Sequence, residues 1–168
     1  MKEITNKRKN RILNVLKKRQ KDLTLVLNNI HDPHNVSAIL RSCDAFSVFR
    51  VHLLYNTHTF PTLGKKCSAS AKKWLEIKRY TNSQDLLQEL HSQGMQTLTT
   101  GFGPKAIPLH ECNLTLPSAI ILGNEHSGVE QDISSNAAEE IYIPMQGMVQ
   151  SLNVSVAAAI ILYEAWSQ

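Results

Sequence analysis

The sequence repeatedly places short, continuous apolar runs between stretches of helical periodicity, and few folds accept that pattern. Such runs occupy residues 23–27, 51–55 and 119–122. A strand that is apolar on both faces is typical of a parallel sheet covered by helices on both sides. Further strands are indicated at residues 74–79, 96–100 and 141–143, and helices at residues 35–46, 83–91, 130–135 and 152–166. This alternation predicts an α/β fold with a mainly parallel sheet flanked by helices.

Length and composition restrict the class of protein further. The chain has 168 residues, enough for one domain with its own core. Apolar residues make up 42% and charged residues 19%, which excludes a disordered chain. No apolar run approaches the roughly 20 residues of a membrane span, and three widely spaced cysteines encode neither a disulfide framework nor a zinc site. We therefore expect a cytoplasmic protein without signal peptide, membrane contact or metal.

Positive charge is concentrated at the N-terminus. Residues 1–21 contain nine Lys or Arg against one acid, whereas residues 22–168 contain nine basic and thirteen acidic side chains. A helix over residues 6–19, capped by Thr5 or Asn6, would display this charge. A basic arm on a mildly acidic body suggests a polyanion partner, usually nucleic acid; a solvated, lysine-rich helix is the alternative. We therefore divide the chain into a basic N-terminal helix, residues 1–21, and a body, residues 22–168.

The loops that follow apolar strands form the candidate ligand site. They span residues 28–35, 99–103, 123–128 and 144–153. In open α/β sheets, ligands bind beyond the carboxyl ends of the strands. Gly123 would let the backbone approach a ligand closely. The loop 144–153 is neutral and suits a flat, uncharged group such as adenine better than a phosphate, and the sequence has no GxGxxG or Walker A pattern.

Two side chains near the first loop could serve a ligand. Asn35 stands where a helix N-cap would, and Arg41 follows six residues later. One interpretation is a capping asparagine with a surface arginine. The other is a partly buried guanidinium committed to an anion. Ser151 is in a position to cap the last helix, and Trp74 is interpreted as a packing or interface residue.

Three ordered segments carry a resemblance to a known family. They are residues 35–41 (NVSAILR), 121–125 (ILGNE) and 143–157, from IPM to SLNVSVA. Together they resemble the SpoU (TrmH-like) branch of the SPOUT methyltransferases, and the similarity runs over nearly the whole chain. Residues 7–20 and 31–35 resemble the members that methylate guanosine 18 of tRNA.

The resemblance implies an α/β domain whose C-terminal part forms a deep trefoil knot, a topology that periodicity does not predict. It implies S-adenosylmethionine as the cofactor, bound in a bent conformation, and a homodimer with its active site near the subunit interface. The reaction would be 2′-O-methylation of a tRNA ribose, that of guanosine 18 in the D-loop. The body, residues 22–168, would then be the catalytic domain and the leader would contact RNA.

The resemblance also assigns roles to individual residues. Those implied for catalysis are Arg41, which matches the family's essential arginine, with Asn35, Glu125, Ser151 and Asn153. Those implied for the cofactor pocket are Thr100, Gly123, Asn124, Ile143, Met145 and Leu152. Those implied for RNA contact are Arg8, Arg11 and Arg19 of the leader.

The sequence leaves several alternatives open. Arg41 could accept the proton of the ribose hydroxyl, or it could hold a phosphate and stabilise the developing alkoxide. The substrate could be ribosomal RNA, or the protein could be a non-catalytic RNA-binding protein on the same fold or an ordinary nucleotide-binding module. The tRNA-modifying members usually carry a further basic C-terminal segment, whereas this sequence ends at Gln168. We therefore expect this chain to differ from those members in how it binds tRNA, and so in its exact substrate.

Overall fold

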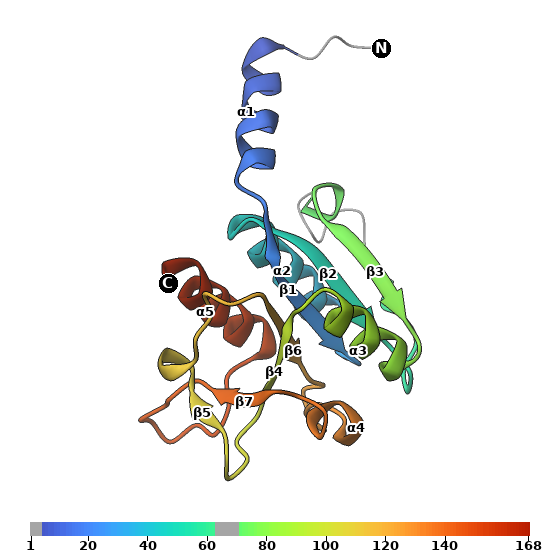
Figure 1. Cartoon of the computed structure of the whole chain (residues 1–168), viewed down its shortest axis with the longest axis vertical. Coiled ribbons are helices and arrows are strands. Elements are labelled where there is room, and N and C mark those ends of the chain that lie inside the picture. The colour runs from blue at the N-terminus through green and yellow to red at the C-terminus, as the bar shows by residue number, and fades with distance from the viewer. Residues whose placement is uncertain (1–4, 63–70) are drawn as a thin grey trace.

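A seven-stranded parallel sheet organises the protein in the computed structural model, which describes residues 5–62 and 71–168 (Figure 1). The order across the sheet is β3-β2-β1-β6-β4-β7-β5, and every neighbouring pair is parallel. The strands are β1 (Gln20–Asn28), β2 (Val48–Leu54), β3 (Glu76–Tyr80), β4 (Gln96–Thr100), β5 (Ile107–Pro108), β6 (Ser118–Leu122) and β7 (Glu139–Tyr142). The predicted α/β fold with a mainly parallel sheet is therefore confirmed.

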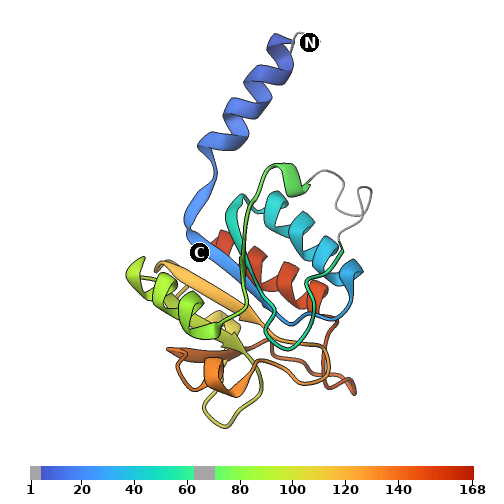
Figure 2. The same ribbon diagram turned by 90° about the vertical axis from the view of Figure 1, so that its right-hand side faces the viewer.

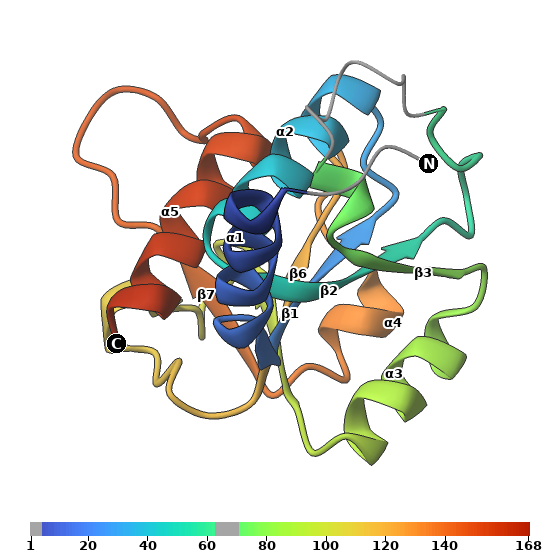
Figure 3. The ribbon, with the colours of Figure 1, turned by 90° about the horizontal axis from the view of Figure 1, so that it is seen from above.

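Helices cover both faces of this sheet. The helices of the structure are α1 (Asn6–Lys17), α2 (Pro33–Ala45), α3 (Ser83–Ser92), α4 (Gln131–Ser134) and α5 (Val154–Ser167), with short 3₁₀ turns η1 (Ala71–Lys73) and η2 (Leu109–Glu111). Helices α2 and α5 pack together on one face, and α3 and α4 lie on the other (Figure 3). None of the helices in the described ranges is long and apolar enough to cross a bilayer.

The described residues form two hydrophobic cores, one on each face of the sheet, and the apolar runs of β1 and β6 contribute side chains to both. Leu25 of β1 and Ile120 of β6 are paired in register and face the core beneath α2 and α5. Val26 and Ile121, one residue further along, are also paired and face the core beneath α3 and α4. Since successive side chains of a strand point to opposite faces, a central strand must be apolar throughout.

Both predicted helix caps beside the loops are wrong, and each real cap lies two or three residues away. Helix α2 begins at Pro33, and Asp32 is its N-cap, with the side chain accepting from the backbone N–H of His34 at 2.8 Å. Helix α5 is capped by Asn153 instead of Ser151. These shifts leave the Asn35 and Ser151 side chains free for other contacts. The short strand β5 and the turn η2 were not predicted.

The N-terminal helix α1 stands apart from the rest of the molecule. Its N-cap is Thr5, as predicted, and none of its residues is buried. It extends from the start of β1 away from the sheet (Figure 2). Its apolar side chains Leu13 and Leu16 remain about half exposed. The knot implied by the resemblance stays a prediction.

Candidate active site

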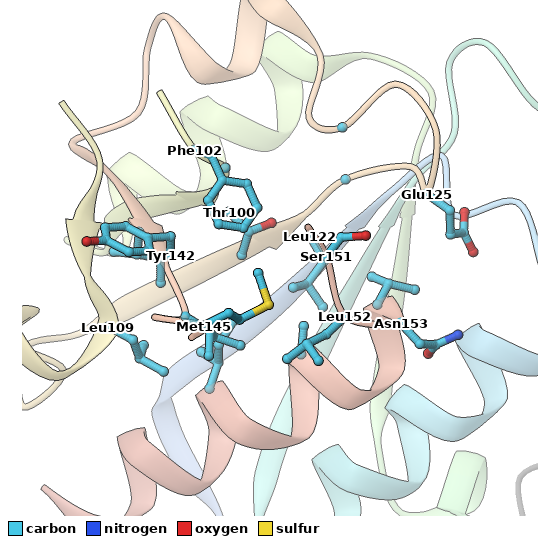
Figure 4. Close-up of a pocket in the computed structure, with 18 of the residues that line it drawn as sticks. Thr100, Phe102, Leu109, Leu122, Glu125, Tyr142, Met145, Ser151, Leu152 and Asn153 are labelled. Carbon is cyan, nitrogen blue, oxygen red and sulfur yellow. The ribbon is translucent and has the colours of Figure 1, made fainter. Parts of the chain in front are cut away.

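A pocket of about 450 Å³ opens beyond the carboxyl ends of β4, β6 and β7, beside the start of α5 (Figure 4). This is the edge of the sheet where a parallel α/β fold places its ligands, and the volume is ordinary for a small-molecule site. The structure brings all six of the predicted cofactor residues into the pocket lining: Thr100, Gly123, Asn124, Ile143, Met145 and Leu152.

Gly123 is required by a close approach of two backbone segments. A Cβ atom at this position would lie 2.1 Å from the carbonyl carbon of Gly128, which no packing adjustment could relieve. The two segments meet because Asn124 and Gly128 exchange backbone hydrogen bonds of 2.9 Å in both directions. The turn between them therefore folds back tightly over the end of β6, and it forms one wall of the pocket.

The pocket lining is largely apolar and nearly free of charge. Thr100 and Phe102 lie on one side, and Met145 and Leu152 lie on the side nearer α5 (Figure 4). Among the lining residues that the structure describes there is no lysine or arginine, and the one carboxylate is Glu125. Since a phosphate here would lack a cationic partner, the lining fits a flat, neutral or cationic ligand.

Glu125 joins three segments of the chain that are far apart in sequence. Its carboxylate accepts from the Asn35 side-chain amide at 2.7 Å and from the backbone N–H of His31 at 2.9 Å. A longer bond of 3.4 Å comes from the N–H of Asp32. The Asn35 oxygen in turn accepts from the Asn153 amide at 3.1 Å. Three of the predicted catalytic residues are thus linked in one hydrogen-bonded group.

This environment keeps Glu125 ionised. Burial alone would raise the pKa of its carboxyl, but the hydrogen bonds from Asn35 and from the backbone of His31 and Asp32 outweigh it and hold the pKa below its usual value. An ionised carboxylate can only accept hydrogen bonds. Glu125 therefore fixes the position of the loop before α2 and does not serve as a proton donor at neutral pH.

A second polar group behind the pocket was not predicted. Asn28 and Asn56 each donate to the Glu130 carboxylate, at 3.0 and 2.8 Å, and Asn124 donates to the backbone carbonyl of Asn29 at 2.7 Å. Asn29 itself adopts a left-handed conformation with φ of 51°. The available signal was an asparagine within two residues of the end of each of three apolar runs, since the carboxyl ends of neighbouring parallel strands lie together.

A model of the SpoU rRNA methylase family matches residues 22–163. The chain belongs to this family. The tRNA (guanosine(18)-2′-O)-methyltransferase of Thermus thermophilus is 42% identical over 168 residues, which cover 100% of this chain and 86% of that protein.

Two solved structures extend the comparison to the fold of the SpoU family. A TrmH/SpoU tRNA modifying enzyme of Aquifex aeolicus matches with a TM-score of 0.89 at 38% identity, over 96% of this chain and 82% of that one. The SpoU methyltransferase AviRb of Streptomyces viridochromogenes, solved with the cofactor AdoMet, matches with a TM-score of 0.77 at 22% identity, over 89% and 61%. The second likeness concerns the fold alone.

Two of the predicted catalytic residues are not part of the hydrogen-bonded group in this SpoU chain. Ser151 is exposed and lines the pocket. Arg41 lies on α2 nearly two turns beyond Asn35 and outside the pocket lining, and its side chain is exposed, so of the two interpretations the surface arginine is the one that the structure shows. Within residues 5–62 and 71–168 it has no ion pair or hydrogen-bonded side-chain partner, so its guanidinium is available to an external anion.

The three arginines predicted to contact RNA fall into two groups. Arg8 and Arg11 are exposed on α1. Arg19 instead has a side chain only 3% exposed, forms an ion pair with Asp44 and donates to the carbonyl of Val48 at 2.7 Å. A guanidinium that is committed to these partners is not available to a phosphate. The structure therefore corrects the prediction for Arg19, which anchors the end of the leader to the body.

Proposed function

We propose that this protein transfers a methyl group from S-adenosylmethionine to the 2′-hydroxyl of guanosine 18 in tRNA. The observation that carries this proposal is the neutral pocket at the strand ends, bordered by the Asn35–Glu125–Asn153 group. Support for the substrate comes from the relative of Thermus thermophilus, to which all 168 residues of this chain align with 42% identity. The proposal assigns catalysis to residues 22–168 and RNA contact to residues 1–21.

The chemistry of the pocket fits this cofactor. Thr100, Gly123, Asn124, Ile143, Met145 and Leu152 would hold it, because an adenosine needs apolar surface and backbone polar groups and has no phosphate to neutralise. When bound, S-adenosylmethionine supplies an electrophilic methyl group and loses its positive charge as that methyl is transferred. The ionised Glu125 at the rim is compatible with a cationic ligand and unfavourable for an anionic one.

The contribution of the protein is mainly orientation. The hydrogen bonds from Asn35 to Glu125 and from Asn153 to Asn35 hold the start of α2 against the start of α5. Fixing an acceptor oxygen in line with a methyl group can supply several kcal/mol of the barrier, about 7 or more in the best oriented systems. Ser151 lies on the same rim and is positioned to contact the ribose or the cofactor tail.

Arg41 supplies charge in this mechanism. An exposed guanidinium remains protonated at neutral pH, so it is a poor base and a good partner for a phosphate. It can make paired hydrogen bonds with an RNA phosphate and stabilise negative charge that develops on the ribose oxygen. We therefore favour the electrostatic role of Arg41 over that of proton acceptor.

We further propose that two copies of the chain associate through α5. Val156, Ile160 and Tyr163 lie on one side of this helix and are 47%, 37% and 57% exposed. An exposed apolar strip of this kind marks an interaction surface. Because α2 packs against α5, a second copy there would approach Arg41 and complete the site. Sedimentation should give a dimer, and Ile160→Glu should give a monomer with little activity.

A cytoplasmic location completes the proposal. The described cysteines Cys43 and Cys112 are both free and buried, which is compatible with a reducing compartment. Burial raises the pKa of the Cys43 thiol to about 12, so that thiol is unreactive.

Labelled-methyl transfer tests the proposed function. The protein is incubated with labelled S-adenosylmethionine and with total tRNA or ribosomal RNA, and the modified nucleotide is mapped. We expect label on the ribose of tRNA guanosine 18 and little on ribosomal RNA. Label on ribosomal RNA alone would show that ribosomal RNA, and not tRNA, is the substrate. Binding of the cofactor in calorimetry without methyl transfer to either RNA would contradict the proposed enzyme activity.

A further inference from the structure

A second cavity, of about 510 Å³, lies between α1 and the body. Its α1 wall presents Lys7, Arg8 and Arg11, and its body wall presents Trp74 and Asp44. The cavity, hereafter the leader groove, lies where the chain enters β1, whereas the cofactor pocket lies at the carboxyl ends of the strands. The nine residues of β1 separate these two ends by about 30 Å.

Trp74 is held in a fixed position at the edge of the leader groove. Its neighbours Ala71 and Leu75 are only 4% and 8% exposed, and the N–H of Trp74 donates to the carbonyl of Ala71 at 2.8 Å to close the turn η1. The indole itself is partly exposed and lines the groove. A large aromatic side chain whose backbone is anchored by buried neighbours, and which itself remains accessible, is suited to contact a ligand.

The charge of the leader groove is positive. Lys7, Arg8 and Arg11 are exposed on α1, and within the described part of the chain none of them forms an ion pair. The negative charge of Asp44 is balanced by its ion pair with Arg19. Three basic side chains that line one cavity with an accessible tryptophan form the combination that binds single-stranded nucleic acid, in which cations contact phosphates and an aromatic ring stacks on a base.

We propose that the leader groove receives an unpaired nucleotide of the RNA substrate, with its base stacked on Trp74 and its phosphates contacting Arg8 and Arg11. The nucleotide must be unpaired, because a base within a helix has both faces covered by its neighbours. It differs from the nucleotide methylated by the same subunit, because the groove and the pocket lie at opposite ends of the sheet. This inference rests on the proposed RNA substrate and adds a second contact point to it.

Tryptophan fluorescence tests the stacking directly. The chain contains two tryptophans, Trp74 and Trp166, so Trp74→Phe leaves one reporter. A phenyl ring still stacks, so this variant should bind tRNA with nearly the affinity of the unaltered protein. Adding tRNA should quench emission of the unaltered protein, and most of that quenching should be lost in Trp74→Phe. Equal quenching in both proteins would contradict the proposal.

Binding and kinetics separate stacking from a structural role. Trp74→Leu keeps apolar volume but removes the ring, and it should weaken tRNA binding about 10-fold, within the range for loss of one stacked base. The loss should appear in KM for tRNA more than in kcat. The dependence of affinity on salt should not change, because no phosphate contact is removed. Unaltered affinity in Trp74→Leu would overturn the proposal.

The same measurements distinguish this inference from the proposed function. If Trp74→Leu binds tRNA normally while guanosine 18 is still methylated, the proposed role of the leader groove is wrong and the proposed methyltransferase activity stands. If the unaltered protein binds S-adenosylmethionine but methylates no RNA, the proposed function fails first. A change in Trp74 emission with protein concentration alone, without RNA, would show that a second copy covers the groove and would also overturn the proposal.

Discussion

The two ends of the sheet differ in how their functional side chains are held. At the carboxyl end, Asn35, Glu125 and Asn153 are fixed by hydrogen bonds to one another and to the backbone. At the other end, α1 has no buried residue, and Arg8 and Arg11 are exposed at the wall of the leader groove. Methyl transfer requires a preformed geometry, whereas contact with a folded polyanion requires charge that can adjust to it.

Arg41 belongs neither to the hydrogen-bonded group at the carboxyl end nor to the basic helix α1. Its substitution provides the sharpest test of the proposed active site at the carboxyl end. Arg41→Ala should lower kcat by about 100- to 1000-fold, the range seen when one group that stabilises a developing oxyanion is removed. Affinity for S-adenosylmethionine, measured by calorimetry, should remain unchanged because Arg41 does not line the pocket. Arg41→Lys retains the charge but cannot make the paired hydrogen bonds, so its kcat should lie between those of the unaltered protein and Arg41→Ala. Turnover near normal in Arg41→Ala would refute the assignment.

The sequence predicted the pocket end of the molecule well, because the signals there are local. The continuous apolar runs of residues 23–27 and 119–122 admit only buried strands, and loops after such strands must meet at one edge. The position of the predicted cofactor residues follows from these features.

Other predictions failed because long-range contacts decided between local alternatives. Asp32 and Asn35 are both good capping residues, and Asn35 is not the cap because Glu125, ninety positions away, holds its side chain. Arg19 resembles its basic neighbours in sequence, yet Asp44 removes it from solvent. Strand β5 has only two residues, one of them a proline, and so carries no periodicity.

Acid sensitivity should belong to the body and not to the leader. His52 in β2 is fully buried, and burial lowers its pKa from 6.5 to about 4. Both ring nitrogens lack a partner among the described residues. Because the unfolded chain binds the proton more tightly, stability from this group is complete above pH 6.5 and decreases as the pH falls to 4, by about 3 kcal/mol in all.

Urea unfolding at pH 7.5 and pH 4.5 measures this effect. His52→Leu should remove most of the difference between the two pH values, since a buried aliphatic side chain has nothing to protonate. His91 is exposed at the end of α3, so His91→Leu is the matched control and should retain the full loss. A pH dependence that persists in His52→Leu would place the acid-sensitive group elsewhere.

Arg19 should contribute to the stability of the fold, whereas the exposed basic residues beside it should not. Arg19→Ala leaves Asp44, which is one third exposed, without its cation, and it should lower the free energy of unfolding by about 2 kcal/mol. Lys18 is exposed beside it, so Lys18→Ala is the control and should change stability by less than about 0.5 kcal/mol. Chemical unfolding curves measure both. An Arg19→Ala protein as stable as Lys18→Ala would mean that the ion pair does not anchor the leader.

The substitutions Arg8→Gln and Arg11→Gln should have the smallest effect, and it should appear only in RNA binding. Each should reduce the slope of log Kd for tRNA against log salt by about 0.7 to 0.9, the value of one lost phosphate contact. Unfolding stability should not change, because neither side chain is buried. Arg19→Ala should lower stability while leaving the slope intact, since its guanidinium contacts Asp44 and Val48 rather than solvent. If Arg19→Ala also reduces the slope, the leader must release this arginine when RNA binds, and the division between an anchoring and a binding arginine would fail.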